Sequence, residues 1–167
     1  MFQLKGIEKM NEEQKMKYMI NKIQAQLSSE DNALANISNA TAIIYAIIER
    51  INWAGFYFIN NDELVLGPFQ GLPACNRIQI GKGVCGAAVV ERKVQRIADV
   101  CSFPGHIACD AASKSEIVIP IIKDDIVYGV LDIDSPELDR FSELEEKYLV
   151  KFVELLNEYV DWNGIKR

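Results

Sequence analysis

Positive charge is scarce in this sequence, and histidine occurs only once. Among its 167 residues, 18 Lys and Arg stand against 24 Asp and Glu, which gives a formal net charge of −6. No segment gathers Lys and Arg into the cluster that binding to a phosphate backbone needs. The composition therefore argues against a nucleic-acid groove, and we expect no nucleic-acid partner.

Long apolar runs are also missing. The longest is "TAIIYAII" at residues 41–48, far shorter than the roughly 20 residues that cross a bilayer. The N-terminus, "MFQLKGIEKMNEEQKMKYM", lacks the apolar segment of about 7–15 residues that marks a signal peptide. We therefore expect no membrane partner and a cytoplasmic location.

The four cysteines do not have the spacing of a metal knuckle. Cys75, Cys85, Cys101 and Cys109 are ten, sixteen and eight positions apart, with no C-x-x-C pair, and His106 is the only histidine. Zinc is disfavoured, and we expect no metal. A framework of structural disulfides is also disfavoured, because the cytosol keeps thiols reduced. Two interpretations remain, inert buried thiols and thiol redox chemistry.

The pattern of apolar residues predicts the fold class. The length suits one domain with its own core, and 49% of the residues are hydrophobic. Helical periodicity at both ends and strand alternation between them predict α+β, a central antiparallel sheet with the N- and C-terminal helices packed on one face. We expect helices over residues 8–27, 33–51 and 142–160, a short helix after the glycine loop at 81–83, and strands over 53–60, 63–70, 77–80, 94–100, 116–123 and 126–134.

Helical spacing also predicts which side chains face the core. The last helix begins at a capping box formed by Ser142 and Glu145. The expected core-facing residues are Leu34, Ile37, Ile44, Ile48 and Ile51 in the second helix, and Leu144, Tyr148, Phe152, Leu155 and Tyr159 in the last.

Two aspartates share one face of a predicted strand. In "YGVLDIDSP", alternation places Asp132 and Asp134 opposite Leu131 and Ile133. Carboxyl groups at i and i+2 lie roughly 7 Å apart along a strand. If a loop covers them, desolvation and mutual repulsion raise the pKa of at least one. Such a group holds a proton at neutral pH and can donate it.

Further residues extend this predicted polar face. Alternation turns Glu116 away from the core and puts Trp53 and Tyr57 together on one face. An aromatic wall beside carboxylates suits a ligand that carries an ammonium group and a methyl group. The same spacing is equally compatible with a half-solvated sheet whose outer residues have no special role.

The segment "GKGVCGAAVV" reads as a glycine turn that enters a helix. Exposed backbone N–H groups at a helix start favour an anion, and a thiolate at Cys85 in the first turn would be stabilised there. The alternative is a plain turn with a small buried residue.

The stretch "FPGHIACDAASKSEIVIP" places a cysteine in polar, Gly- and Ala-rich surroundings. A packing cysteine belongs in an apolar run, so the placement of Cys109 suggests reactivity. His106 stands three residues earlier and would pair with Cys109 if the segment were helical. Cys101 has no such context.

Five segments together resemble the free methionine-(R)-sulfoxide reductases, which are single GAF-domain enzymes that reduce the free amino acid. They are "NWAGFYF", "LGPFQGLPAC", "IGKGVCGAAV", "FPGHIACDAASKSEIVIPI" and "YGVLDIDSP". The resemblance runs from about residue 30 to residue 156. It implies an N-terminal helical extension over residues 1–28 and a single GAF domain over 29–162.

The resemblance also implies roles for individual residues. Cys109 would be the nucleophile, Cys85 the main resolving thiol, and Cys75 a second thiol that relays the disulfide. It further implies an acidic pocket and an aromatic wall, formed by Glu116, Asp132, Asp134, Trp53 and Tyr57. No bound cofactor is expected, and thioredoxin would be the external reductant of an enzyme whose substrate is free methionine-(R)-sulfoxide.

Two other functions fit the same segments less fully. A GAF sensor would bind a small metabolite without turnover, and an interaction domain would have no small-molecule site. The N-terminal helix is a candidate for pairing two copies into a homodimer, although its mixed charges equally suit a solvated face.

Overall fold

The computed structural model describes residues 4, 6–107 and 109–165. Residues 1–3 and 5 of the expected extension lie outside the described residues. The helices are η1 (Ile7–Lys9), α1 (Glu12–Leu27), α2 (Ala33–Ile47), α3 (Gly83–Glu91), η2 (Val100–Ser102), α4 (Glu143–Tyr159) and η3 (Trp162–Gly164), where η marks a 3₁₀ helix. The strands are β1 (Trp53–Asn60), β2 (Glu63–Gly71), β3 (Arg77–Gln79), β4 (Gln95–Ile97), β5 (Ser115–Lys123) and β6 (Ile126–Ser135).

The strands form one six-stranded sheet in the order β3-β2-β1-β6-β5-β4, and every neighbouring pair is antiparallel. Both predicted hairpins are present. In the turn of the second, Asp124 and Asp125 have φ angles of 51° and 61°. Aspartate tolerates this left-handed region, which suits a two-residue hairpin turn. The predicted antiparallel α+β fold is confirmed.

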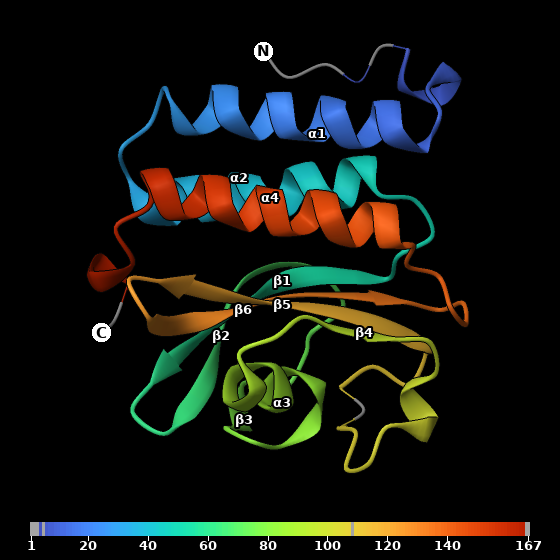
Figure 1. The fold of residues 1–167 in the computed structure, drawn as a ribbon, viewed down its shortest axis with the longest axis vertical. Helices are drawn as coiled ribbons and strands as arrows, with labels where there is room; N and C mark the ends of the chain where they lie inside the picture. Colours follow the sequence, from blue (N-terminus) through green and yellow to red (C-terminus); the bar gives the residue numbers. More distant parts are fainter. Residues whose placement is uncertain (1–3, 5, 108, 166–167) are drawn as a thin grey trace.

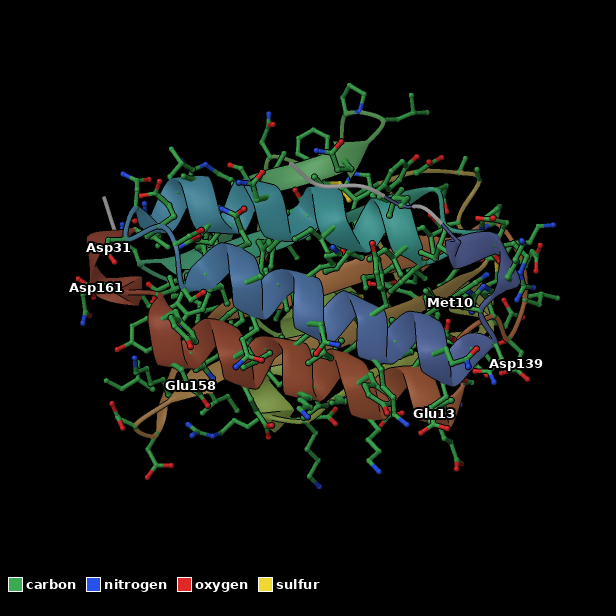
Figure 2. The ribbon with its side chains drawn as sticks, turned by 90° about the horizontal axis from the view of Figure 1, so that it is seen from above. Met10, Glu13, Asp31, Asp139, Glu158 and Asp161 are labelled. Carbon is green, nitrogen blue, oxygen red and sulfur yellow. A yellow bond between two sulfur atoms is a disulfide. The ribbon has the colours of Figure 1, made fainter. Side chains whose placement is uncertain are left out.

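Helices α1, α2 and α4 lie on the same side of the sheet (Figure 1). Helices α2 and α4 contact the sheet, while α1 is outermost and lies over the two of them, as the view from above shows (Figure 2). The N- and C-terminal helices therefore pack on one face, as predicted. The apolar side of α1 is buried in the same core, through Met16, Met19, Ile20, Ile23 and Leu27.

Helix α1 begins later than the sequence suggested. Asn11 caps it, because its side chain accepts a hydrogen bond from the Gln14 backbone N–H while the Gln14 side-chain oxygen accepts one from the Asn11 backbone N–H. This capping box explains why the helix proper starts after residue 8. The apolar face of α1 is used within the chain, so the surface it leaves for another copy is polar, with Glu13 and Lys17 paired at 2.8 Å.

Several helix boundaries and faces differ from the predictions. Helix α2 ends at Ile47 instead of Ile51, because Ile48 is already extended and leads the chain into β1. Leu34 is 63% exposed, since it lies in the first turn of α2 and points away from the core. Tyr159, in the last turn of α4, is 39% exposed. Phe152 and Leu155 are buried as predicted, Leu144 and Tyr148 are half-buried, and the buried stripe of α4 also includes Leu149, Val153 and Leu156.

The strand predicted over residues 94–100 is limited to Gln95–Ile97. Asp99 ends it by accepting a hydrogen bond from the Cys101 backbone N–H, which starts the 3₁₀ helix η2. Within residues 4, 6–107 and 109–165, no helix has both the length and the apolar character to cross a membrane.

The opposite face of the sheet is covered by α3 and by the loops after β4 (Figure 1). A second, smaller apolar cluster forms there, and Trp53, Tyr57, Cys85 and Val118 belong to it. The candidate acids Glu116, Asp132 and Asp134 face this layer.

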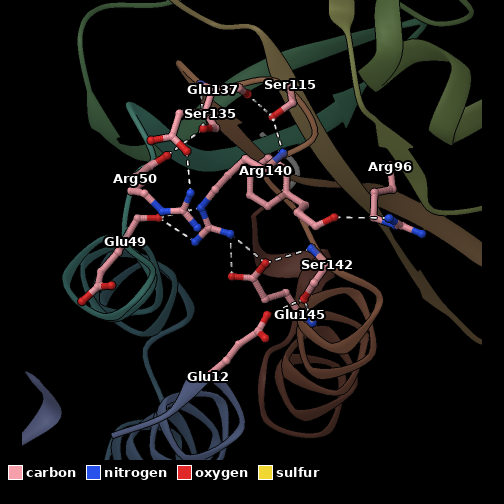
Figure 3. Close-up of polar contacts among 11 residues, drawn as sticks. Glu12, Glu49, Arg50, Arg96, Ser115, Ser135, Glu137, Arg140, Ser142 and Glu145 are labelled. Carbon is pink, nitrogen blue, oxygen red and sulfur yellow. Dashed lines mark hydrogen bonds and ion pairs between the residues drawn. The ribbon is translucent and has the colours of Figure 1, made fainter. Parts of the chain in front are cut away.

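A buried arginine joins the end of α2 to the start of α4 (Figure 3). Arg140 Nη1 donates to both carboxylate oxygens of Glu145, at 2.9 and 2.8 Å, and both side chains are buried. Arg140 Nε and Nη2 donate to the Glu49 carbonyl at 3.0 and 2.6 Å, which fixes the end of α2. Ser142, the cap of α4, donates its hydroxyl to Glu12 at the start of α1.

We expect Arg140→Met to destabilise the protein by about 3–5 kcal/mol, because it leaves the Glu145 carboxylate buried without its partner. Arg50→Met is the matched control, since Arg50 pairs with Glu137 in an exposed position and should change stability by less than about 1 kcal/mol. Urea unfolding followed by circular dichroism measures both. Equal losses in the two variants would contradict a special role for Arg140.

Candidate functional site

Three neighbouring strands place acidic and aromatic side chains in one row. Glu116 on β5 pairs in register with Asp134 on β6, and Asp134 pairs with Trp53 on β1. Asp132, two residues along β6, lies opposite Gly55 of β1. These side chains point to the face covered by α3, where they line a pocket.

The predicted alternation of these strands is confirmed. Leu131 and Ile133 of β6 lie in the main core beneath the helices, as does Ile117 of β5. Asp132 and Glu116 line the pocket on the other face and are nevertheless buried, each 6% exposed.

The aromatic wall is a stack over the start of β1. The rings of Trp53 and Tyr57 have centroids 5.9 Å apart, and Phe69 also stacks with Trp53, at 5.4 Å. Gly55 makes this arrangement possible, because a Cβ atom there would lie 2.5 Å from the Trp53 ring and 2.4 Å from Phe69 Cβ. Trp53 and Tyr57 are together on one face, as expected.

The same two rings hold the chain segment that leads to Cys75. The indole Nε1 of Trp53 donates to the Leu72 carbonyl at 3.2 Å, and the hydroxyl of Tyr57 donates to the Cys75 carbonyl at 3.0 Å. The loop between β2 and β3 is thereby fixed over the pocket.

Helix α3 brings Cys85 against the acids. Its first residue, Gly83, has a φ of +61°, which favours glycine, and Cys85 follows in the first turn. The thiol is buried, and Cys85 Sγ lies 3.9 Å from Glu116 Oε1. One ligand atom from each of Cys85, Glu116 and Asp132 lies within 4.8 Å of the other two.

Burial dominates the protonation of this cluster. Desolvation raises the pKa of Glu116 and of Asp134 well above the ordinary carboxyl range, and the charge of Asp132 raises both further. Desolvation also raises the pKa of Asp132, to about 6. The hydrogen bonds from Cys85 and Glu116 lower this pKa, but the effect of burial is larger. The prediction that at least one acid here has a raised pKa is confirmed.

The expected Cys85 thiolate is not supported. Burial, followed by the charges of Asp132 and Glu116, raises the pKa of the Cys85 thiol well above its ordinary value. The expectation of a stabilised thiolate was wrong, because burial and the neighbouring carboxylate charges outweigh the favourable effect of the start of a short helix.

A disulfide joins Cys75 to Cys109, with 5.4 Å between their Cα atoms. Both residues are half-buried, and Cys109 lines the pocket. Cys85 stays a free buried thiol, and Cys101 is a free exposed one on η2. Of the three cysteines singled out, the structure therefore bonds two beside the pocket and buries the third among the acids.

His106 contacts an acid, and no helix pairs it with Cys109. Residues 104 and 105 form a turn, and none of the described residues 103–107 and 109 is helical, so they do not give the helical spacing expected between His106 and Cys109. His106 Nε2 lies 3.9 Å from Glu116 Oε2, and burial lowers the pKa of the imidazole. His106 thus closes the pocket beside Glu116.

Sequence reasoning missed the residues that hold the loop after Cys109. Asn52 Nδ2 donates to Asp110 Oδ2 at 2.8 Å and to Ser113 Oγ at 3.0 Å, and Asp110 Oδ1 accepts from the Ala112 backbone N–H at 2.8 Å. Asp110 and Ser113 also line the pocket. The turn pattern after Cys109 was a usable signal for Asp110, but nothing in the sequence marked Asn52 as its partner.

The donor atoms of Cys85, Glu116 and Asp132 are close enough to share a cation. Asp132 Oδ1 is buried and has no hydrogen-bond partner within the described residues. An unpartnered carboxylate oxygen beside an aromatic wall equally fits the ammonium group of a small ligand. The expectation of no bound metal stays a prediction.

Comparison with known proteins agrees with this architecture. Residues 36–158 match the family model of the GAF domain. The chain is 52% identical over 150 residues to Protein YtsP of Bacillus subtilis, with 89% of this chain and 92% of that protein covered. It is 48% identical over 143 residues to the free methionine-R-sulfoxide reductase of Escherichia coli, with 86% and 87% covered.

A solved structure shows the same fold. The free methionine-R-sulfoxide reductase of Neisseria meningitidis in complex with its substrate superposes with a TM-score of 0.89 at 35% identity, covering 93% of this chain and 94% of that one. The boundary between an extension over 1–28 and a domain over 29–162 stays a prediction, because α1 shares the main core. By these matches the chain belongs to the GAF-domain family, among the free methionine-R-sulfoxide reductases.

Proposed function

We propose that the protein reduces free L-methionine-(R)-sulfoxide to methionine with electrons from its own thiols. The observation that carries this proposal is the Cys75–Cys109 disulfide beside a pocket of buried carboxyl groups. A thiol pair supplies two electrons, and the carboxyl groups hold the proton that a departing oxygen needs. The names of the relatives supply the substrate.

The first step is attack by the Cys109 thiolate on the sulfoxide sulfur. A carboxyl group of the cluster protonates the sulfoxide oxygen, and Glu116 is the best candidate because burial keeps its pKa high and it contacts Cys85 and His106. The oxygen passes to Cys109 as a sulfenic acid, and methionine leaves with its sulfur reduced. The proton that Cys109 gives up replaces the one donated by the acid.

A second thiol then condenses with the sulfenic acid, forming a disulfide and releasing water. The resemblance gives the main part in this step to Cys85 and a relay to Cys75. Two observations support Cys75 as the direct partner: the bond to Cys109, and the raised pKa that keeps the Cys85 thiol protonated. A protonated thiol is a poor nucleophile.

Reduction of the disulfide closes the cycle. We propose thioredoxin as the reductant, because a dithiol protein returns both enzyme cysteines to thiols by exchange. The cycle requires no prosthetic group. A cytoplasmic location and a homodimer belong to the same proposal, the first because the chemistry needs a reducing compartment.

The pocket also accounts for a preference for the free amino acid. Asp132 and Asp134 can accept hydrogen bonds from the α-ammonium group, while Trp53 and Tyr57 pack on the methyl group. The backbone N–H groups at the start of α3, near Gly83, suit the α-carboxylate. A methionine sulfoxide inside a polypeptide has neither charge, so it would leave buried partners unpaired.

The activity itself is tested by NADPH oxidation with thioredoxin and thioredoxin reductase. We expect turnover of free methionine-R-sulfoxide and none of the S epimer or of a blocked dipeptide analogue. If no substrate turns over with either thioredoxin or dithiothreitol, while a metabolite binds the pocket, the protein is a sensor and the proposed function is wrong.

Single replacements separate the three thiols. Cys109→Ser should abolish methionine formation, because it removes the attacking sulfur. Cys75→Ser should form one methionine per protein molecule and then stop, whereas Cys85→Ser should continue with thioredoxin. Rapid-quench product analysis counts the turnovers. The reverse pattern, with Cys85→Ser stopping after one turnover and Cys75→Ser continuing, would return the resolving role to Cys85.

Asp132→Asn should stabilise the oxidised protein while lowering its activity. Because burial raises the pKa of Asp132 from 3.8 to about 6, the unfolded chain loses this proton first, and the folded state is penalised increasingly as the pH rises through this range. At pH 8 the ionised Asp132 costs the folded state its full amount, about 3 kcal/mol. At pH 4.5 the cost is roughly a third of that.

Urea unfolding of Asp132→Asn at the two pH values measures this gain. Asp62→Asn, at an exposed position in the β1–β2 turn, is the control and should behave like the unaltered protein at both. A gain that is the same at pH 4.5 and pH 8 would show that the carboxylate charge is not its cause.

A further inference from the structure

Two chain segments near the disulfide are free of formal charge. Residues 71–76, "GLPACN", and residues 103–107, "FPGHI", contain no Asp, Glu, Lys or Arg, although 25% of the whole chain is charged. The first segment ends one residue after Cys75, and the second ends two residues before Cys109. Each cysteine of the disulfide therefore has an uncharged stretch on its N-terminal side, and Asp110 directly follows Cys109.

These stretches expose apolar side chains. Leu72 is 65% exposed and Ile107 is 38% exposed, and Pro73 and Pro104 are exposed as well. Leu72 precedes Cys75 by three residues and Ile107 precedes Cys109 by two, so each lies within about 11 Å of its cysteine along the chain. We call Leu72, Pro73, Pro104 and Ile107 the apolar rim.

The backbone beneath the rim is held in place. The Leu72 carbonyl accepts the Trp53 indole hydrogen bond and the Cys75 carbonyl accepts the Tyr57 hydroxyl. Ile107 lies over the start of α3, where a Cβ atom at Gly83 would meet its side chain at 3.4 Å. The apolar rim is thus an exposed apolar surface on a backbone that is held in place. Protein-binding sites typically have both properties.

We propose that the apolar rim is the docking surface for the protein dithiol that reduces the Cys75–Cys109 disulfide. This proposal rests on the proposed function in one respect only, namely that the enzyme needs an external reductant. The fitting partner is a thioredoxin-type protein whose reactive cysteine lies in an uncharged, apolar surface. Because the chain carries a net charge of −6, an acidic partner is repelled by much of the surface but not by the rim.

The partner reduces the Cys75–Cys109 disulfide in two exchange steps. A partner thiolate attacks the Cys75 sulfur, a bond between partner and Cys75 forms, and the Cys75–Cys109 bond breaks. Cys109 leaves as a thiolate into the pocket that it lines. The second partner thiol attacks the mixed disulfide and releases Cys75. Two electrons and two protons pass to the enzyme, and the partner becomes the disulfide.

Leu72→Asp tests the rim, because it places a charge on it without touching a pocket side chain. Leu34→Asp is the matched control, since Leu34 is 63% exposed on α2, on the opposite side of the sheet. The oxidised protein is mixed with thioredoxin, its reductase and NADPH without any sulfoxide, and the initial rate of disulfide reduction is followed. We expect Leu72→Asp to slow reduction by thioredoxin at least fivefold and Leu34→Asp to leave it unchanged.

Reduction by dithiothreitol should proceed at the same rate in all three proteins, because a small dithiol needs no docking surface. Leu72→Gln, which adds no charge, should give an intermediate loss with thioredoxin. The proposal is overturned if Leu72→Asp matches Leu34→Asp with thioredoxin, or if dithiothreitol reduction slows equally. The assay contains no sulfoxide, so its result does not depend on whether the protein reduces methionine sulfoxide. The docking proposal and the proposed function can therefore fail separately.

Discussion

Side chains alternate along β6 between an apolar core and a polar pocket, and neither environment would form without the other. Leu131 and Ile133 anchor the sheet beneath the helices, which holds Asp132 and Asp134 on the opposite face. A slip of one residue would exchange the two sets and bury carboxylates under the helices. The register of β6 with β5 and β1 therefore fixes both the core and the chemistry.

The helices on one side of the sheet supply stability that offsets the unfavourable burial of acids on the other side. Three acids are held on the α3 side with raised pKa values, which disfavours the folded state at neutral pH, while the Cys85 thiol beside them stays protonated. On the other side, α1 adds a third helix to the core, and the buried pair of Arg140 and Glu145 locks α4 to the end of α2. Stability and reactivity are thus supplied by opposite faces of one sheet.

Local patterns were sufficient to predict the strands, both hairpins and the faces of β1, β5 and β6, because alternation depends only on neighbouring residues. The family resemblance added expected roles for the three cysteines, and these roles stay predictions. Helix ends were less predictable: α2 stops at Ile47 because the chain must turn into β1, which no periodicity in the helix records. The bond from Cys75 to Cys109 and the anchor at Asn52 depend on contacts between distant segments, so composition and spacing could not supply them.

The disulfide encloses more than the two cysteines that form it. Cys75 and Cys109 are 34 positions apart, and the chain between them contains β3, α3, β4 and η2, which is nearly the whole layer above the pocket, Cys85 included. Closing a loop of this length removes chain entropy worth on the order of 4 kcal/mol from the unfolded state. Each oxidation therefore tightens that layer into a covalent ring and each reduction opens it again, while the helices across the sheet remain outside the ring.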